Sequence, residues 1–194
     1  MFKPCAENSE LHASRAAELQ AIAQADQDDR KPPIDWQKVW PRDEERRRRV
    51  GEIYGEGCFK DAADYAAGAI VFQHGVTPDH FFQTFLWSKR GVELGDSSQK
   101  WLMAAGIDRY LVNIGRKQLF ATQASKPSPN ACWCLEPQEK SFPAKRILED
   151  TGKTVKQQLE WIDSLNQGAP SCRPAKFCET HRANSPKGTI PGFW

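Results

Sequence analysis

The segment from Ser98 to Ile114 is apolar on nearly every helical face, and this limits the fold more than any other part of the chain. A helix with no polar stripe has to be covered by neighbouring elements. Elsewhere apolar residues recur at three- and four-residue steps, and no run alternates long enough to build a sheet. The sequence therefore predicts a mainly α fold, a helical bundle around a central apolar helix at about 98–114.

Capping and helix-breaking residues set the limits of the other predicted helices. Thr77 and Pro78 are typical of an N-cap and a first-turn proline, and Pro41 with the acidic residues after it favours a helix start near Asp43. We expect helices at about 11–29, 43–55, 61–74, 78–95 and 154–165, an extended aromatic connection at 32–40 and an extended segment at 117–123. The helical domain should cover 11–165, and the Cys- and Pro-rich tail 166–194 should be irregular and packed on it.

Composition excludes some functional classes. Seven Trp and ten Phe supply burial units that a disordered chain lacks, and 27 Lys and Arg against 25 Asp and Glu leave a net charge of +2, too balanced for a broad nucleic-acid surface. The run Arg46–Arg49 is the exception. Because it follows three acidic residues, we interpret it as a solvated helix face with carboxylate–guanidinium pairs, with a nucleic-acid contact as the weaker alternative.

No stretch of eighteen apolar residues is present, so no transmembrane helix is expected and we predict no membrane association. The first residues also lack the apolar region of a secretory signal. A mature form whose leader has been removed is an alternative that the cysteines favour.

Six cysteines leave three interpretations open. Four of them lie in the last third of the chain among prolines, where few apolar residues can form a core. Disulfides would place the protein in an oxidising compartment, secreted or periplasmic, whereas free thiols would favour the cytoplasm. Zinc is the weaker alternative, with no other cofactor expected, and its ligands would be Cys132, Cys134, Cys172, Cys178 and His181. Cys58 is expected to pair with Cys5 or to be a buried thiol rather than a nucleophile.

Several polar residues lie on segments that otherwise resemble core. Asp108 and Arg109 lie inside the central apolar helix, and His74 shares a face with Ile70 at the end of the alanine-rich helix. A buried charge needs a partner. We predict that these positions meet at one end of the bundle in a cluster completed by Asp26, Arg30, Gln73, Gln118, Thr122 and Gln123.

Such a cluster permits a limited chemistry. A histidine held by a carboxylate suits general acid–base catalysis, which assigns catalytic roles to His74 and Asp108. Arg30 and Arg109 would hold an anion, and Gln118 and Gln123 would orient it. The alternative is a purely structural network that ties helix ends together. Phosphate loops, nucleophile elbows and zinc-binding helices have no counterpart in the sequence.

The same polar residues make the chain similar to a known protein family. The chain resembles a family of uncharacterised bacterial helical proteins over about residues 11–165, through Asp26 with Arg30, Gln73-His74, Asp108-Arg109 and a closing segment with Gly115, Gln118, Thr122 and Gln123. Ala121 stands where the family leads us to expect glycine, and Gly75 where alanine is commoner. The resemblance implies that these polar residues act as a unit and implies no substrate.

Our leading hypothesis is that the chain binds a small polar or anionic ligand in this cluster, with acid–base chemistry of the hydrolase or lyase kind. The alternative is a protein-interaction module with exposed aromatic anchors, namely Trp36, Trp40, Phe193 and Trp194.

Overall fold

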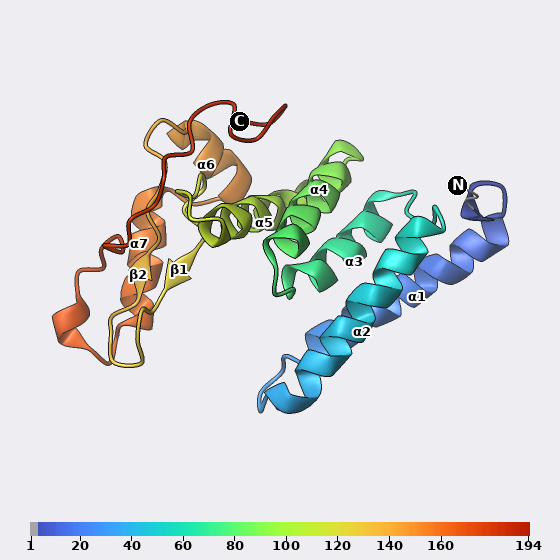
Figure 1. Cartoon of the computed structure of the whole chain (residues 1–194), viewed down its shortest axis with the longest axis horizontal. Coiled ribbons are helices and arrows are strands. Elements are labelled where there is room, and N and C mark those ends of the chain that lie inside the picture. The colour runs from blue at the N-terminus through green and yellow to red at the C-terminus, as the bar shows by residue number, and fades with distance from the viewer. Residues whose placement is uncertain (1–3) are drawn as a thin grey trace. The chain divides into compact units, whose positions relative to one another are not determined.

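The computed structural model describes residues 4–194, which fold into a mainly helical protein with a small two-stranded sheet (Figure 1). The chain forms two compact units, Met1–Met103 and Ala104–Trp194, whose boundary falls inside α5 (Lys100–Asn113). The predicted fold class is confirmed. The predicted division at residue 165 does not coincide with the observed boundary, because the tail belongs to the second unit.

The first unit is a bundle of four long helices, and a side chain caps the start of three of them. Asn8 caps the first, Asp61 forms a capping box with Asp64 on the third, and Thr77 precedes Pro78 on the fourth. In the first unit, α1 packs against α2 and α3, and α3 packs against α4. The bounds are α1 Ser9–Asp28, α2 Trp36–Gly55, α3 Ala62–Gln73 and α4 Pro78–Glu93.

Helix α2 starts earlier than predicted. The extended connection expected through residue 40 ends at Asp35, and Pro41 lies inside the helix. Proline lacks one backbone N–H donor and clashes with the preceding turn, at a cost of about 3 kcal/mol. The long packed helix outweighs that cost, since Val39 is buried before the proline and Asp43 after it.

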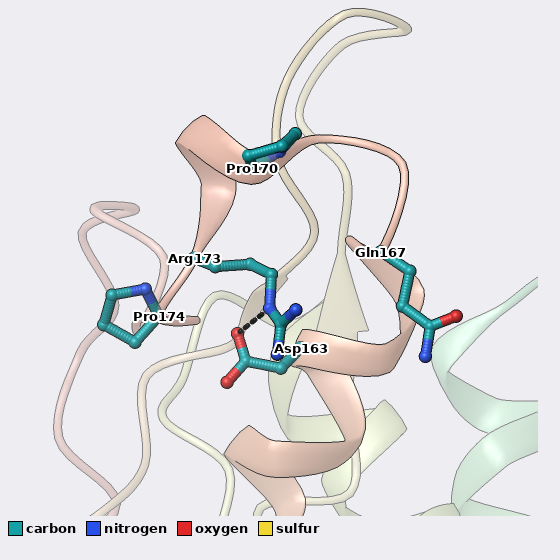
Figure 2. Close-up of a pocket in the computed structure, with 5 residues that line it drawn as sticks. All are labelled: Asp163, Gln167, Pro170, Arg173 and Pro174. Atoms are coloured by element: carbon teal, nitrogen blue, oxygen red, sulfur yellow. Dashed lines mark ion pairs between the residues drawn. The ribbon is translucent and has the colours of Figure 1, made fainter.

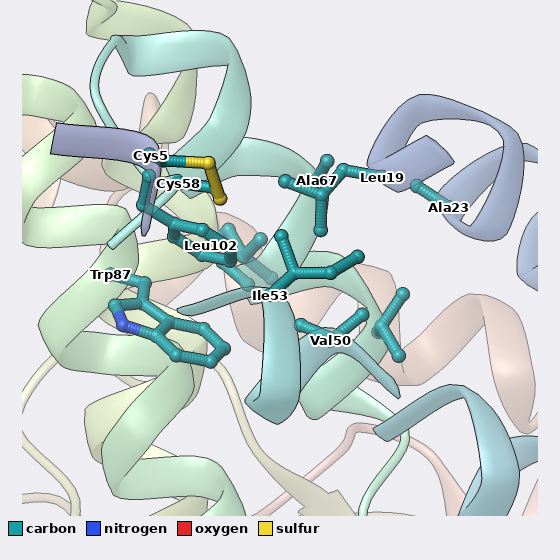
Figure 3. Packing of buried hydrophobic residues seen from close by; sticks show 12 residues of the cluster. Cys5, Leu19, Ala23, Val50, Ile53, Cys58, Ala67, Trp87 and Leu102 are labelled. Carbon is teal, nitrogen blue, oxygen red and sulfur yellow. A yellow bond between two sulfur atoms is a disulfide. The ribbon is translucent and has the colours of Figure 1, made fainter. Parts of the chain in front are cut away.

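The core of the first unit gathers side chains from all of its helices around the disulfide between Cys5 and Cys58 (Figure 3). Phe59 and Trp87 pack with ring centroids 5.0 Å apart. Gly68 makes this possible, because a Cβ there would lie 2.5 Å from the Phe59 ring. The disulfide also confirms the interpretation of Cys58 as a partner for Cys5.

The middle of helix α5 has the all-round burial that its sequence predicts, whereas Trp101 near its start is 51% exposed. Seven consecutive residues, 102–108, are buried, which is two helical turns without a solvent face. A short 3-10 turn, Ser97–Gln99, precedes it, and Asp96 caps that turn.

The second unit contains two elements that the sequence analysis missed. Strands β1 (Ala124–Ser125) and β2 (Cys134–Leu135) pair antiparallel, and α6 spans Ala144–Thr151. Two-residue strands are too short for an alternating pattern, and α6 begins at Pro143 without a capping side chain. The last helix, α7 (Val155–Leu165), matches the predicted helix at 154–165, and Thr154 is its N-cap.

Two disulfides tie the tail to the body of the second unit. Cys132 pairs with Cys172 and Cys134 with Cys178, and the Cys178 N–H donates to the carbonyl of Leu135 at 2.8 Å. The irregular, disulfide-linked tail is therefore confirmed. Paired in this way, the four sulfurs offer no thiolate to zinc, and His181 is exposed, so the structure favours the disulfide interpretation of these cysteines.

Candidate functional site

His74 and Asp26 form a histidine–carboxylate pair in the first unit. His74 is the C-cap of α3, and its Nδ1 lies 2.8 Å from Oδ2 of Asp26 on α1. The Asp26 side chain is fully buried, whereas the His74 side chain is 23% exposed. No hydrogen bond of His74 Nε2 is found within residues 4–194. The imidazole is thus held at one nitrogen and partly open to solvent.

Arg30 holds the carboxylate side of this pair instead of being free for an anion. Its Nη1 donates to the Asp26 carbonyl at 2.8 Å and to Asp26 Oδ1 at 3.0 Å, and its Nη2 donates to Asp43 Oδ2 at 2.6 Å. Two buried carboxylates therefore share one guanidinium. These bonds already occupy the guanidinium fork and support a role for Arg30 in positioning Asp26; its role as an anion clamp stays a prediction.

Two arginines of the run on α2, Arg46 and Arg49, form ion pairs with residues outside that helix. Arg46 binds Asp29 and Asp43, and Arg49 binds Glu18 on α1 at 2.5 and 2.8 Å. These bonds tie α1 to α2 and neutralise Arg46 and Arg49. Hydrogen bonding to Arg49 holds the pKa of Glu18 below its usual value.

Asp108 is fully buried in the second unit and is saturated by donors. It accepts hydrogen bonds from the backbone N–H groups of Leu119, Phe120 and Thr122 and from the Thr122 hydroxyl, at 2.7–3.1 Å. Burial raises the pKa of Asp108 to about 6, while these hydrogen bonds favour the charged form and oppose the rise. With no oxygen left for a substrate proton, Asp108 is not supported as a catalytic residue.

The segment that Asp108 holds contains a left-handed residue. Ala121 has φ 61°, and it is fully buried. Non-glycine residues pay about 1–2 kcal/mol in this conformation. The hydrogen bonds to Asp108 on either side stabilise it, which gives a structural reason for expecting glycine at this position.

The amide residues of the second unit also bond to one another. Gln118 accepts from the Gln123 N–H at 2.8 Å and donates to the carbonyls of Gln123 and Glu136. Gln123 in turn accepts from Arg109 Nε at 3.2 Å. These bonds match the structural alternative better than the predicted ligand-orienting role.

The predicted site residues thus fall into two groups. In the first unit the structure brings together Asp26, Arg30 and His74, with Gln73 buried beside His74 in sequence. In the second unit it brings together Asp108, Arg109, Gln118, Thr122 and Gln123. The convergence of all nine residues in one cluster stays a prediction. The sequence analysis missed Asp43, because nothing in the pattern separates it from the acidic residues that follow it.

The cavities of the second unit include one at the end of α7, of about 390 Å³ (Figure 2). Its charged groups compensate one another: Arg173 Nε lies 3.7 Å from Asp163 Oδ1, which also accepts from the Ala175 N–H at 2.7 Å. The other lining residues are Gln167, Pro170 and Pro174. This arrangement offers no reactive group.

The aromatic residues proposed as interaction anchors differ in their exposure to solvent. Trp36 and Trp40 on α2 are 46% and 63% exposed, with ring centroids 6.4 Å apart. Trp194 instead packs on Phe142, with ring centroids 4.9 Å apart, and its Nε1–H donates to the Ser185 carbonyl. The C-terminal pair, Phe193 and Trp194, is therefore half-buried, which corrects the expectation that it is exposed.

One group of metal-ligand type lies in the first unit among the described residues, formed by His12, Asp61 and Asp64. Both carboxylates already accept backbone N–H groups in the capping box of α3, Asp61 from Asp64 and Asp64 from Asp61. The group is explained by helix capping.

No helix among residues 4–194 combines the length and the apolarity needed to cross a bilayer. Comparisons with protein-family models, with curated proteins and with solved structures return no match to this chain.

Proposed function

We propose that the first unit binds a small polar ligand, such as an organic anion, beside His74, and that His74 transfers a proton to or from it. One observation carries the proposal: a partly exposed imidazole whose Nδ1 is 2.8 Å from a fully buried carboxylate. A carboxylate at Nδ1 places the ring proton there and leaves the Nε2 lone pair as a base. Asp26 is the orienting partner in place of Asp108.

The surroundings support the orienting role of Asp26. It accepts from Arg30 at 3.0 Å and from Gln27 at 2.9 Å, so its two oxygens are fixed before any ligand arrives. A base whose position is fixed in advance loses less entropy on reaction. The reaction class that fits is proton transfer in a hydrolase- or lyase-type step.

The test compares His74 with a second His–Asp pair in the same unit. His12 Nε2 lies 3.1 Å from Asp64, and the His12 side chain is 20% exposed, close to the value for His74. A panel of small carboxylates, amides and phosphate esters would be screened by ligand-observed NMR with the oxidised full-length chain. At least one hit should disappear with His74→Ala and persist with His12→Ala. Equal loss in both variants, or the absence of any hit that His74→Ala removes, would reject the proposal.

A second candidate function rests on Trp36 and Trp40, whose exposure is high for tryptophan on a packed helix. Paired exposed aromatics are typical energetic centres of protein interfaces. The double variant Trp36→Ala/Trp40→Ala should then release partners that the intact chain retains from extracts of its native host. Trp161→Ala, at a site 40% exposed on α7, is the matched control. Retention of the same partners by the double variant would remove this candidate.

A further inference from the structure

A cavity of about 410 Å³ in the first unit lies between α2, the end of α3 and the first turn of α4. Neither the His74 ring nor Asp26 lines it, so it is distinct from the histidine–carboxylate pair. The residues that line it are Glu44, Arg47, Arg48, Phe72, Val76 and His80.

Two arginines line this cavity, and Arg47 differs from Arg48 in forming no ion pair with a described carboxylate. Its exposure is 9%, and its protein hydrogen bond is to the carbonyl of His74, at 3.1 Å. The other three arginines of the run each pair with carboxylates, but among residues 4–194 no carboxylate lies within 4.0 Å of Arg47. A buried cation that binds only a carbonyl leaves a strong preference for an anion.

His80 adds a neutral donor to the same cavity. Its Nδ1 accepts the backbone N–H of Val76 at 3.1 Å, so the ring proton belongs on Nε2. Burial and the positive charge of Arg47 lower the pKa of His80, which favours this neutral form at pH 7. His80 therefore offers an N–H group without adding a second full charge.

Gly75 lets the His80 ring take this place. A Cβ at Gly75 would lie 2.3 Å from the Cβ of His80 and 2.5 Å from its Nδ1. Alanine at this position would displace the ring. Phe72 contacts the His80 ring edge-on, with the two ring centroids 5.7 Å apart. Phe72 and Val76, which is 75% exposed, form an apolar wall of the cavity.

We propose that this cavity binds a small monocarboxylate with an apolar group. The carboxylate would accept from Arg47 and His80, and its apolar part would contact Phe72 and Val76. A monoanion fits better than phosphate, because Arg48 is already paired with Glu52 and Glu44 adds negative charge to the lining. This site does not depend on the proposed role of His74.

Benzoate is the probe, titrated into the oxidised full-length chain and followed by calorimetry and by NMR shifts of the His80 ring. The intact chain should bind it saturably and more tightly than inorganic phosphate. Arg47→Gln should weaken binding about ten-fold or more, since hydrogen bonds to charged groups are worth roughly 1.5–3 kcal/mol. Lys89→Gln, on the exposed face of α4, should bind as the intact chain does.

Further variants keep the test decisive if Arg47→Gln does not fold. Gly75→Ala and His80→Phe leave Arg47 in place and should each weaken benzoate binding several-fold. His74→Ala removes the neighbouring imidazole but keeps the carbonyl that Arg47 uses, and it should bind normally. Absence of saturable binding, tighter binding of phosphate, loss of binding in His74→Ala, or unchanged affinity in Gly75→Ala and His80→Phe would each overturn the proposal.

Discussion

Asp108 shows how a charged residue inside an apolar helix can serve the fold. Its carboxylate binds four donors in Leu119, Phe120 and Thr122, eleven to fourteen positions later in the chain. These bonds satisfy backbone N–H groups that no regular element satisfies. The residue thereby shapes the segment after α5, including the left-handed Ala121.

We predict that Asp108→Asn destabilises the protein by about 3 kcal/mol, because an amide NH2 would face backbone N–H groups in a buried site. Urea unfolding followed by tryptophan fluorescence measures the change. Asp96→Asn is the control, since Asp96 caps the turn before α5 and asparagine caps equally well. If the Asp108→Asn variant had normal stability but no longer bound ligand, that result would instead support a catalytic role for Asp108.

Between elements, a set of charged hydrogen bonds in the first unit joins α1 and its C-cap to α2. Glu18 receives two hydrogen bonds from Arg49, and Asp29 receives one from Arg46 at 2.5 Å. The arginine run thus orients two helices through paired charges. Bidentate, partly buried pairs of this kind contribute more than isolated surface pairs.

Acid should loosen this connection. The pKa of Glu18 is lowered by the hydrogen bond from Arg49, and the pKa of Asp29 by that from Arg46. A carboxyl whose pKa is lower in the folded state stabilises the fold above its unfolded pKa, about 4.5 for Glu18, and loses that contribution as the pH falls through the folded value. We expect the urea concentration at the unfolding midpoint to decrease as the pH is lowered below about 4.5.

The matched variants are Glu18→Gln and Glu7→Gln, because Glu7 is exposed and has no ion-pair partner among the described residues. Glu18→Gln should lower the midpoint at pH 7 and flatten its dependence on pH. A pH profile identical to that of Glu7→Gln would contradict the role of the α1–α2 pairs.

Both units depend on covalent cross-links. One disulfide lies in the first unit and two in the second, closing loops of 53, 40 and 44 residues. In the chain-entropy account each closure stabilises the folded state by about 4 kcal/mol. Three disulfides fit a secreted or periplasmic protein, the compartment expected if the cysteines are oxidised.

Thiol titration in denaturant should therefore find no free cysteine before reduction and six after it. Peptide mapping without reductant should recover Cys132 linked to Cys172 and Cys134 linked to Cys178. Reduction should lower the melting temperature markedly. Six titratable thiols in the protein isolated from its native host would contradict this assignment.

Local patterns in the amino-acid sequence were sufficient to predict the helices α3, α4 and α7. Their starts follow from Asp61, Thr77 and Thr154, because a capping side chain and the N–H that it binds lie within one turn. The pairing of Asp26 with Arg30 is also local, at i,i+4 spacing. The all-round burial of residues 102–108 in α5 followed from the apolar residues of that segment.

Contacts between distant residues could not be predicted in this way. Asp26 meets His74 across 48 positions, and Arg47 binds the His74 carbonyl across 27. Such partners depend on how helices pack, and packing is set by the sum of many side-chain contacts without a short sequence signature. For the same reason the sequence marked both His74 and Asp108 as polar residues in core segments, and only the tertiary structure decided that the His74 imidazole is partly exposed and the Asp108 carboxylate fully buried.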